Sequence, residues 1–239
     1  MNMKPPARKD PTALEKKKIF LVDDHTILRE GLAELINHSE HLTVCGVAAS
    51  ADEALDRIPA VKPDLVIVDL ALPETGGMEL LRTLRIRHSN IPALVLSMHD
   101  ESVYAERALR AGARGYIMKH EAITELKAAI QRVLDGGLYL SRRLSDQFLE
   151  SAVRARPGRD VPPISRLSDR EFEVLEMIGL GQGTSEIARK LRLSVKTIET
   201  YQAKLKEKLD LPDAAKLLQY AMRWVRAADS ANPQAGPSI

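Results

Sequence analysis

Short apolar runs alternate with helical patterns along residues 19–135. Five of the runs have the length and composition of buried strands: "IFLVD", "LTVCGVA", "DLVIVDL", "ALVLSM" and "RGYIMK". The third and fourth runs are apolar almost throughout, which is typical of strands that are covered on both faces. Apolar residues recur at helical spacing near 26–37, 51–60, 76–88, 101–111 and 121–135. Five strands that alternate with five helices predict a doubly wound parallel sheet of the α/β class, a (βα)5 unit.

The pattern changes after this first unit. A pair of glycines, a helical stretch around 144–153 and the string "RPGRDVPPIS" predict that 136–165 is a linker with a short helix. Apolar spacing is helical throughout 166–226, in four segments, which predicts a small all-α domain. The two ends, 1–18 and 227–239, are rich in Pro, Lys or small residues and are expected to be disordered.

Composition and charge add two constraints. The chain has 239 residues, of which 44% are hydrophobic and 28% are charged, as expected for globular domains with buried cores. No apolar run reaches the roughly 18 residues needed to cross a bilayer, and the first residues lack the apolar core of a signal peptide. We therefore expect a cytoplasmic protein without a membrane partner. The net charge of +2 contains −6 over 19–135, +3 over 166–226 and +4 over 1–18, with +1 in the remaining residues, so the two units differ in sign and the helical domain is the one suited to a polyanion.

Polar residues end four of the five predicted strands. Asp23 and Asp24 end the first strand, Asp69 the third, Ser97 the fourth and Lys119 the fifth. Because the carboxyl ends of parallel strands meet at one edge of the sheet, where ligands bind near the reversal of strand order, we expect these side chains to lie together. Three carboxylates at close range repel one another unless a cation is present. Oxygen ligands of this kind favour Mg²⁺.

A carboxylate in such a site can attack phosphorus and form an aspartyl phosphate. Asp69 is the candidate nucleophile because it is the single acid at the end of its strand. Mg²⁺ and the Lys119 ammonium would spread the charge of the transferring group, and the Ser97 hydroxyl would bond a phosphoryl oxygen. At any one of these positions, a helix cap or a solvated loop residue is the alternative, but that alternative explains their joint position less well. His25 and His99 are expected to be solvated loop residues rather than ligands.

The last third of the chain has the signals of a helix-turn-helix. In "LSDREFEVLEMIGLG", Ser168 stands three residues before Glu171, which is the spacing of a capping box. The short segment "TSEIARKLRL" leads through a turn to the longer "SVKTIETYQAKLKEKL", with Ser194 as its predicted N-cap. An ordinary helical bundle with a charged face is the alternative. One side of the longer helix carries Ile198, Tyr201, Gln202, Leu205 and Leu209, and the other carries Lys196, Thr200, Ala203 and Glu207.

The strings "LVDDH", "VIVDLALPETGGMEL", "LVLSMHDE" and "ARGYIMK" resemble the receiver domain of bacterial two-component response regulators. The resemblance spans 19–135 and implies a flavodoxin-like fold that takes a phosphoryl group from a phosphohistidine of a sensor histidine kinase. It implies the following roles: Asp69 as phosphoacceptor; Asp23, Asp24, Asp69 and the Ala71 backbone carbonyl as Mg²⁺ ligands; Ser97 and Tyr116 as switch residues; and Lys119 as a phosphate contact. A plain core tyrosine is the alternative for Tyr116.

The string from "LSDREFEVLEM" to "KLKEKLDL" resembles the four-helix DNA-binding domain of the LuxR/NarL family, and its pairing with a receiver is similar to the NarL/FixJ class. The resemblance implies that 194–208 is a recognition helix for double-stranded DNA. It also implies a homodimer when the protein is phosphorylated or DNA-bound, with part of the last helix in the contact. Glu199, Thr200 and Ala203 occupy base-reading positions, while Lys196, Thr197, Tyr201, Lys204 and Lys208 are expected phosphate contacts.

The implied function is a transcriptional regulator, and not an enzyme, that is switched by Mg²⁺-dependent phosphorylation. Two other functions stay open from the sequence. Some phosphohydrolases use an aspartate nucleophile with Mg²⁺, but they place a second acid two residues after the nucleophile on the first strand, whereas Asp23 and Asp24 are adjacent. A regulator controlled by ligand or protein binding alone is the third possibility, and the intact acceptor site disfavours it.

Overall fold

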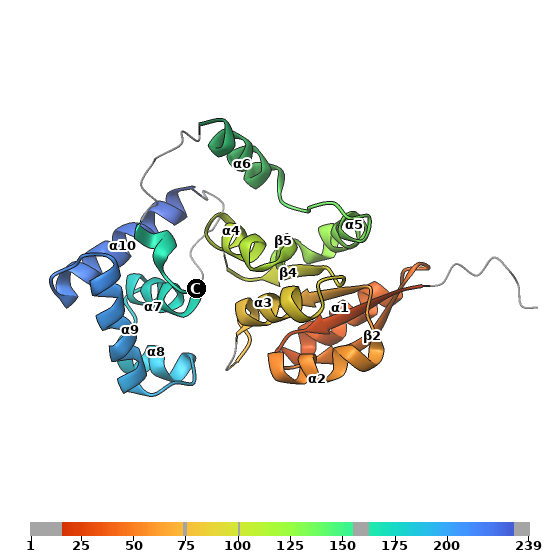
Figure 1. Ribbon diagram of the computed structural model, residues 1–239, viewed down its shortest axis with the longest axis horizontal. Helices are drawn as coiled ribbons and strands as arrows, with labels where there is room; N and C mark the ends of the chain where they lie inside the picture. Colours follow the sequence, from red (N-terminus) through yellow and green to blue (C-terminus); the bar gives the residue numbers. More distant parts are fainter. Residues whose placement is uncertain (1–15, 74–75, 100, 155–162, 232–239) are drawn as a thin grey trace, which may run out of the picture.

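The computed structural model describes residues 16–73, 76–99, 101–154 and 163–231. The disorder expected for 1–18 and 227–239 concerns segments that lie mostly outside the described residues. Within the described residues the expectation is wrong, because Lys17 and Lys18 belong to the first strand and residues 227–231 belong to the last helix. In the described part of the chain, five parallel strands form one sheet in the order β2-β1-β3-β4-β5 (Figure 1). The strands are β1 (Lys17–Val22), β2 (Leu42–Ala48), β3 (Leu65–Val68), β4 (Ala93–Ser97) and β5 (Ala113–Met118). The predicted doubly wound sheet is confirmed.

The winding of the sheet reverses at β1. β1 pairs in parallel with both β2 and β3, with Ile19 opposite Leu65 and Val22 opposite Val68. The carboxyl ends of β1 and β3 therefore flank the crevice in which open α/β sheets bind ligands. Asp23 and Asp69 stand at these two ends.

Helices cover both faces of the sheet. They are α1 (Thr26–Asn37), α2 (Ala51–Val61), α3 (Gly77–Arg87), α4 (Glu101–Ala111) and α5 (Ala122–Leu134), with a 3-10 turn, η1 (Lys119–Glu121), before α5. Ile19 and Leu21 of β1 pack in the cluster formed by α1 and α5, whereas Phe20 and Val22 pack in the cluster formed by α2, α3 and α4. Because neighbouring residues of a strand point to opposite faces, both sets are buried, which accounts for the continuous apolar runs.

The first unit extends beyond its predicted bounds of 19–135. Lys17 and Lys18 pair with β2, so β1 begins two residues earlier than the sequence suggests. After α5, Tyr139 forms a parallel bridge with Gly115: its N–H donates to the Arg114 carbonyl at 3.0 Å, and its own carbonyl accepts from the Tyr116 N–H at 2.9 Å. The segment after α5 therefore covers the edge of β5. A single bridge has no periodicity that a sequence pattern could reveal.

The second unit is helical, as predicted. It follows α6 (Arg142–Arg154) and, within the described residues 163–231, contains η2 (Pro163–Arg166), α7 (Asp169–Gly179), α8 (Thr184–Lys190), α9 (Val195–Lys208) and α10 (Ala214–Ala231). Ser168 and Glu171 form the predicted capping box at the start of α7. Gly179 lets α10 approach closely, since a Cβ there would lie 2.6 Å from the Ala221 carbonyl oxygen. Among the described residues, no helix combines the length and apolar character needed to span a membrane.

Candidate functional site

The strand ends bring together the side chains that the sequence singled out. Asp23 and Asp69 are only 3% and 1% exposed. The Lys119 ammonium donates to Asp69 Oδ2 at 2.6 Å and lies 2.8 Å from Asp23 Oδ2. Ser97 is fully buried at the end of β4. Residues from β1, β3 and β5 thus meet in one acidic pocket, in agreement with the expectation from parallel strand ends.

The pocket has the donor set of a divalent cation site. Ligand atoms of Asp23, Asp24, His25 and Asp69 all lie within 4.8 Å of one another. Asp24 Oδ1 is buried 2.8 Å from His25 Nδ1, and it accepts no hydrogen bond from the described residues. A carboxylate oxygen left without a hydrogen bond among other carboxylates fits the place of a metal ligand. The residues present therefore fit Mg²⁺.

His25 contributes more than the sequence suggested. Its side chain is 64% exposed, as expected for a loop residue, but its N–H donates to Asp23 Oδ1 at 2.8 Å. Its ring nitrogen Nδ1 lies between the carboxylates of Asp23 and Asp24, at 3.3 and 2.8 Å. The backbone N–H of His25 thereby orients Asp23. The adjacency of the histidine to the two aspartates in "DDH" was the available signal.

Burial and neighbouring charges have opposite effects on the pKa of Asp69 and on that of Lys119. Burial raises the pKa of Asp69, and the neighbouring Lys119 ammonium opposes that rise. Burial alone would lower the pKa of Lys119, but the carboxylates of Asp69 and Asp23 raise it overall. Lys119 is therefore cationic at neutral pH. One ammonium among three carboxylates leaves a net negative pocket that attracts a further cation.

The loop after Asp69 turns tightly under the pocket. The Ala71 N–H donates to Asp69 Oδ1 at 3.2 Å. Gly76 has a φ of +74°, and a Cβ on Gly77 would lie 2.1 Å from the Asp69 carbonyl oxygen. At position 77, only glycine fits without moving the backbone. The direction of the Ala71 carbonyl toward a metal stays a prediction.

Ser97 of β4 and Tyr116 of β5 both bond the backbone of His99, whose ring lies against α4. Tyr116 is buried and donates its hydroxyl hydrogen to the His99 carbonyl at 2.7 Å. The His99 N–H donates to Ser97 Oγ at 3.2 Å. The His99 ring stacks on Tyr104, with ring centroids 4.5 Å apart, and its side chain is only 24% exposed. The expectation of a solvated loop histidine is therefore wrong for His99, because α4 supplies a ring that covers it.

The predicted recognition helix is α9. The Ser194 side chain accepts from the Thr197 N–H at 3.1 Å and caps it, as expected. Gln202 donates to Thr184 Oγ1 of α8 at 3.1 Å. The two sides of the helix are as predicted: Ile198, Leu205 and Leu209 are buried, Tyr201 and Gln202 are half-buried, and Lys196, Glu199, Thr200, Ala203, Lys204 and Glu207 are exposed.

Lys208, an expected phosphate contact, has a second partner in the structure. Its ammonium lies 2.6 Å from Glu171 Oε2, a buried carboxylate that also accepts from the Ser168 N–H at 2.8 Å. Burial by itself would raise the pKa of Glu171, but the bonds from Lys208 and Ser168 lower it overall. Lys208 thus ties the end of α9 to the capping box of α7, so its contact with DNA stays a prediction.

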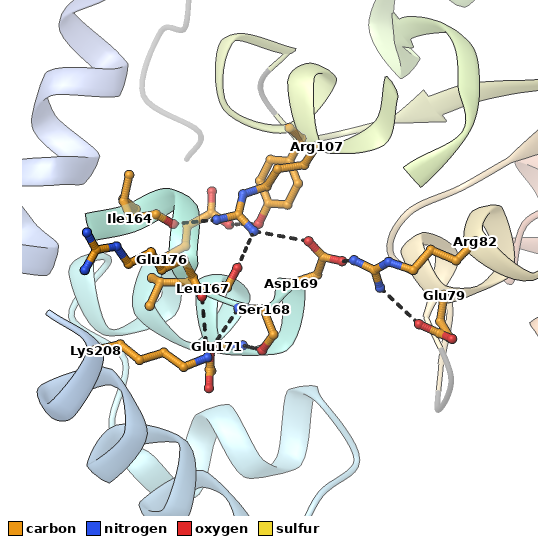
Figure 2. Close-up of polar contacts among 12 residues, drawn as sticks. Glu79, Arg82, Arg107, Ile164, Leu167, Ser168, Asp169, Glu171, Glu176 and Lys208 are labelled. Atoms are coloured by element: carbon orange, nitrogen blue, oxygen red, sulfur yellow. Dashed lines mark hydrogen bonds and ion pairs between the residues drawn. The ribbon is translucent and has the colours of Figure 1, made fainter. Parts of the chain in front are cut away.

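The two units touch through α3 and α4 of the first and α7 and α10 of the second; Figure 2 shows the contacts of Arg82 and Arg107 with Asp169. The Arg107 guanidinium donates to the Ile164 and Leu167 carbonyls at 2.8 and 3.0 Å and to Asp169 Oδ1 at 3.1 Å. Arg82 of α3 pairs with the same Asp169. A cleft of about 390 Å³ separates the loop after Asp69 from Tyr201 and Lys204 of α9. No sequence motif indicated this interface, since its residues are ordinary surface types.

Comparison with known proteins matches both units. Residues 19–131 match the response regulator receiver domain, and residues 165–221 match the bacterial regulatory proteins of the luxR family. The chain is 35% identical over 211 residues to the oxygen regulatory protein NreC of Staphylococcus haemolyticus, covering 86% of this chain and 97% of that protein. The NreC of Staphylococcus carnosus is 34% identical over 212 residues, with the same coverage.

Comparison with solved structures gives two further likenesses. A two-component response regulator of the LuxR family from Aurantimonas sp. SI85-9A1 is 37% identical, with a TM-score of 0.54, covering 58% of this chain and 99% of that one. RcsB of Salmonella typhimurium is 24% identical, with a TM-score of 0.62, covering 87% of this chain and 98% of that one. The second likeness shows the fold alone.

Proposed function

Since the chain belongs to the two-component response regulators that join a receiver to a LuxR-type DNA-binding domain, we propose that Mg²⁺-dependent phosphorylation of Asp69 controls how it binds DNA. The family is one of transcription regulators and not of enzymes. A receiver domain implies a kinase partner. The observation that carries the proposal is the convergence of Asp23, Asp69 and Lys119 at distances of 2.6 to 2.8 Å between the ammonium and the two buried carboxylates.

Asp69 is the proposed acceptor of a phosphoryl group from a phosphohistidine of a sensor histidine kinase. A carboxylate oxygen attacks phosphorus, the new O–P bond forms, and the N–P bond breaks. The imidazole nitrogen keeps the electron pair of that bond and takes up a proton. Lys119, which holds Asp69 Oδ2 at 2.6 Å, orients the carboxylate before transfer and bonds a phosphoryl oxygen afterwards.

Mg²⁺ would be held by Asp23, Asp24, Asp69 and the Ala71 carbonyl, and when bound it supplies positive charge to the transferring group. The His25 N–H keeps the Asp23 carboxylate in position for it. After transfer, the Ser97 hydroxyl donates to a phosphoryl oxygen, and Tyr116, whose hydroxyl bonds the loop at His99, responds to that movement.

Labelling of the full chain tests the acceptor. In the presence of Mg²⁺ and acetyl phosphate, the intact mass of wild type should rise by one phosphoryl group, and Asp69→Asn should show no increase. Asp56→Asn, an exposed acid on α2, is the matched control and should label like wild type. Equal labelling of Asp69→Asn would refute the assignment. Sustained turnover of a phosphomonoester would support the phosphohydrolase alternative instead.

The proposed output is binding of a homodimer to double-stranded DNA through α9. Structures of RcsB bound to the promoter rprA with the phosphomimetic BeF₃⁻, and of RcsB dimers on DNA, support this proposal by analogy. The exposed face of α9 supports it from the chain itself. The receiver (19–135) and the DNA-binding domain (166–226) would act as two units joined by the linker 136–165, in the cytoplasm. The proposed contacts are Lys196, Thr197, Glu199, Thr200, Tyr201, Ala203, Lys204 and Lys208.

A further inference from the structure

His99 bonds Ser97 and Tyr116 through its backbone and contacts α4 through its ring. Its N–H donates to Ser97 Oγ at 3.2 Å, and its carbonyl accepts from the Tyr116 hydroxyl at 2.7 Å. The ring stacks on Tyr104 at a centroid distance of 4.5 Å and an interplanar angle of 30°. Any movement of this backbone segment therefore displaces a ring that lies against α4.

Tyr104 of the receiver makes a hydrogen bond to the DNA-binding domain. It is only 4% exposed, and its hydroxyl donates to Glu176 Oε2 of α7 at 2.5 Å. Burial and the nearby Glu176 raise the pKa of Tyr104, so the hydroxyl keeps the proton that it donates. The same Glu176 oxygen lies 3.9 Å from His99 Nδ1. A carboxylate of α7 is thus bonded by Tyr104 and faced by His99.

The other polar contacts between the units form a separate clamp. Arg107 lies 4.0 Å over the Phe172 ring and donates to the backbone before α7 and to Asp169, while Arg82 also pairs with Asp169 (Figure 2). These contacts hold the start of α7 against α3 and α4. The clamp does not involve His99, whereas Tyr104 and His99 both face Glu176, so these two residues connect the interface with Ser97.

We propose that His99 and Tyr104 form a link that weakens the contact between α4 and α7 when Asp69 is phosphorylated. The proposal rests on the function proposed above. A phosphoryl group on Asp69 offers acceptor oxygens to the Ser97 hydroxyl, and as Ser97 turns toward them the His99 N–H loses its acceptor. An amide left unpaired in a partly buried place is unfavourable, so the segment moves to a new arrangement. The His99 ring moves with it, Tyr104 loses its stacking partner, and the bond to Glu176 breaks.

The chain contains its own reporter of this contact. Trp224 of α10 is the single tryptophan, and its ring meets the Phe172 ring edge-on at 4.9 Å. The Phe172 ring in turn meets Tyr104 at 5.3 Å. Because these rings lie in series across the interface, separation of α4 from α7 changes the surroundings of Trp224, and its fluorescence measures the fraction of molecules in contact.

The test compares full-length wild type with Tyr104→Phe, His99→Ala and the control Glu106→Gln, an exposed position on the same helix that pairs with Arg110. For each protein, Trp224 fluorescence and affinity for a promoter fragment are measured with and without BeF₃⁻ and Mg²⁺, and labelling by acetyl phosphate is measured by intact mass. Labelling separates a failure of phosphorylation from a failure of the link.

Tyr104→Phe removes one hydroxyl that donates to a charged acceptor. We call the form with α4 and α7 in contact closed and the form with them separated open. In the unphosphorylated variant, we expect the ratio of open to closed molecules to rise on the order of tenfold. His99→Ala should label like wild type. Because it lacks the ring that stacks on Tyr104, the contact between α4 and α7 should already be weakened before phosphorylation, and the gain in DNA affinity on phosphorylation should fall by about two- to tenfold, the contribution of one stacked ring pair. Glu106→Gln should match wild type in every measurement.

Two outcomes would overturn the link. One is equal Trp224 fluorescence of Tyr104→Phe and Glu106→Gln, both unphosphorylated. This comparison does not depend on phosphorylation. The other is a full wild-type response of labelled His99→Ala. If wild type itself takes up no phosphoryl group, the proposed function fails, and the first comparison alone decides whether Tyr104 holds the two units together.

Discussion

Lys119 balances the charge of the acidic pocket, so its removal should destabilise the receiver in a way that Mg²⁺ reverses. Its ammonium lies 2.6 Å from Asp69 Oδ2 and 2.8 Å from Asp23 Oδ2, and each of the three side chains is 5% exposed or less. Lys119→Met keeps most of the apolar stem and deletes the charge. Breaking a buried ion pair by removing one partner costs about 3 to 5 kcal/mol. Because the Asp24 side chain of the same cluster is 29% exposed and so partly hydrated, we expect the lower value, about 3 kcal/mol.

Urea unfolding of the full chain, followed by circular dichroism, measures this cost. In EDTA the variant should lose about 3 kcal/mol relative to wild type. At a Mg²⁺ concentration one hundred times its dissociation constant, cation binding raises the free energy of unfolding by about 2.7 kcal/mol. We expect a larger Mg²⁺-dependent gain in the variant than in wild type, since its carboxylates lack the competing ammonium.

Lys127→Met, at an exposed position on α5, is the matched control and should unfold like wild type under both conditions. The reasoning is refuted if Lys119→Met is as stable as wild type in EDTA. A Mg²⁺-dependent gain in the variant no larger than that of wild type would show that Lys119 and the cation do not share the same carboxylates.

Three further changes test other parts of the molecule. Thr200→Ala combined with Lys204→Ala should weaken binding to a promoter fragment and reduce the slope of log affinity against log salt by about one, as expected for the loss of one phosphate contact. Gly77→Ala should lower the rate of labelling by acetyl phosphate, because its Cβ would meet the Asp69 carbonyl oxygen at 2.1 Å. Glu171→Gln should destabilise the DNA-binding domain by about 1 to 2 kcal/mol near neutral pH.

The Glu171 prediction has a defined pH dependence. Its pKa is lowered on folding from an ordinary value of 4.5, so its contribution to stability is present above that value and is lost as the pH falls through the folded-state pKa. The stability of wild type should therefore fall toward that of Glu171→Gln below pH 4.5. A constant difference between the two proteins across this range would contradict the assignment.

The Thr200/Lys204 double variant and Gly77→Ala each have a matched control. Lys127→Ala removes a positive charge from the receiver and should leave the salt slope of DNA binding unchanged. Gly31→Ala adds a methyl group inside α1, where a Cβ would have no neighbour within 4 Å, and should not slow labelling. Equal effects of a test variant and its control would remove the specific role given to Thr200 with Lys204, or to Gly77.

The amino-acid sequence alone is enough to predict the succession of strands and helices and the place of the acidic pocket. The apolar runs identify β3 and β4 because strands covered on both faces leave few polar positions. Their positions along the chain suffice to place Asp23, Asp69 and Lys119 together, since the carboxyl ends of parallel strands share one edge. The helix caps Ser168 and Ser194 could be predicted from the sequence because the residues that they bond lie only three positions away.

Only the tertiary structure decided how the two units meet. Tyr104 and Glu176 are 72 positions apart, and Arg82 and Asp169 are 87 apart, so no local period relates them. It also decided that Lys208 pairs with Glu171 and that His99 is covered by a ring of α4. Local patterns record which side of an element is buried. Which surfaces of two finished domains then touch depends on side chains that look, along the chain, like ordinary solvated residues.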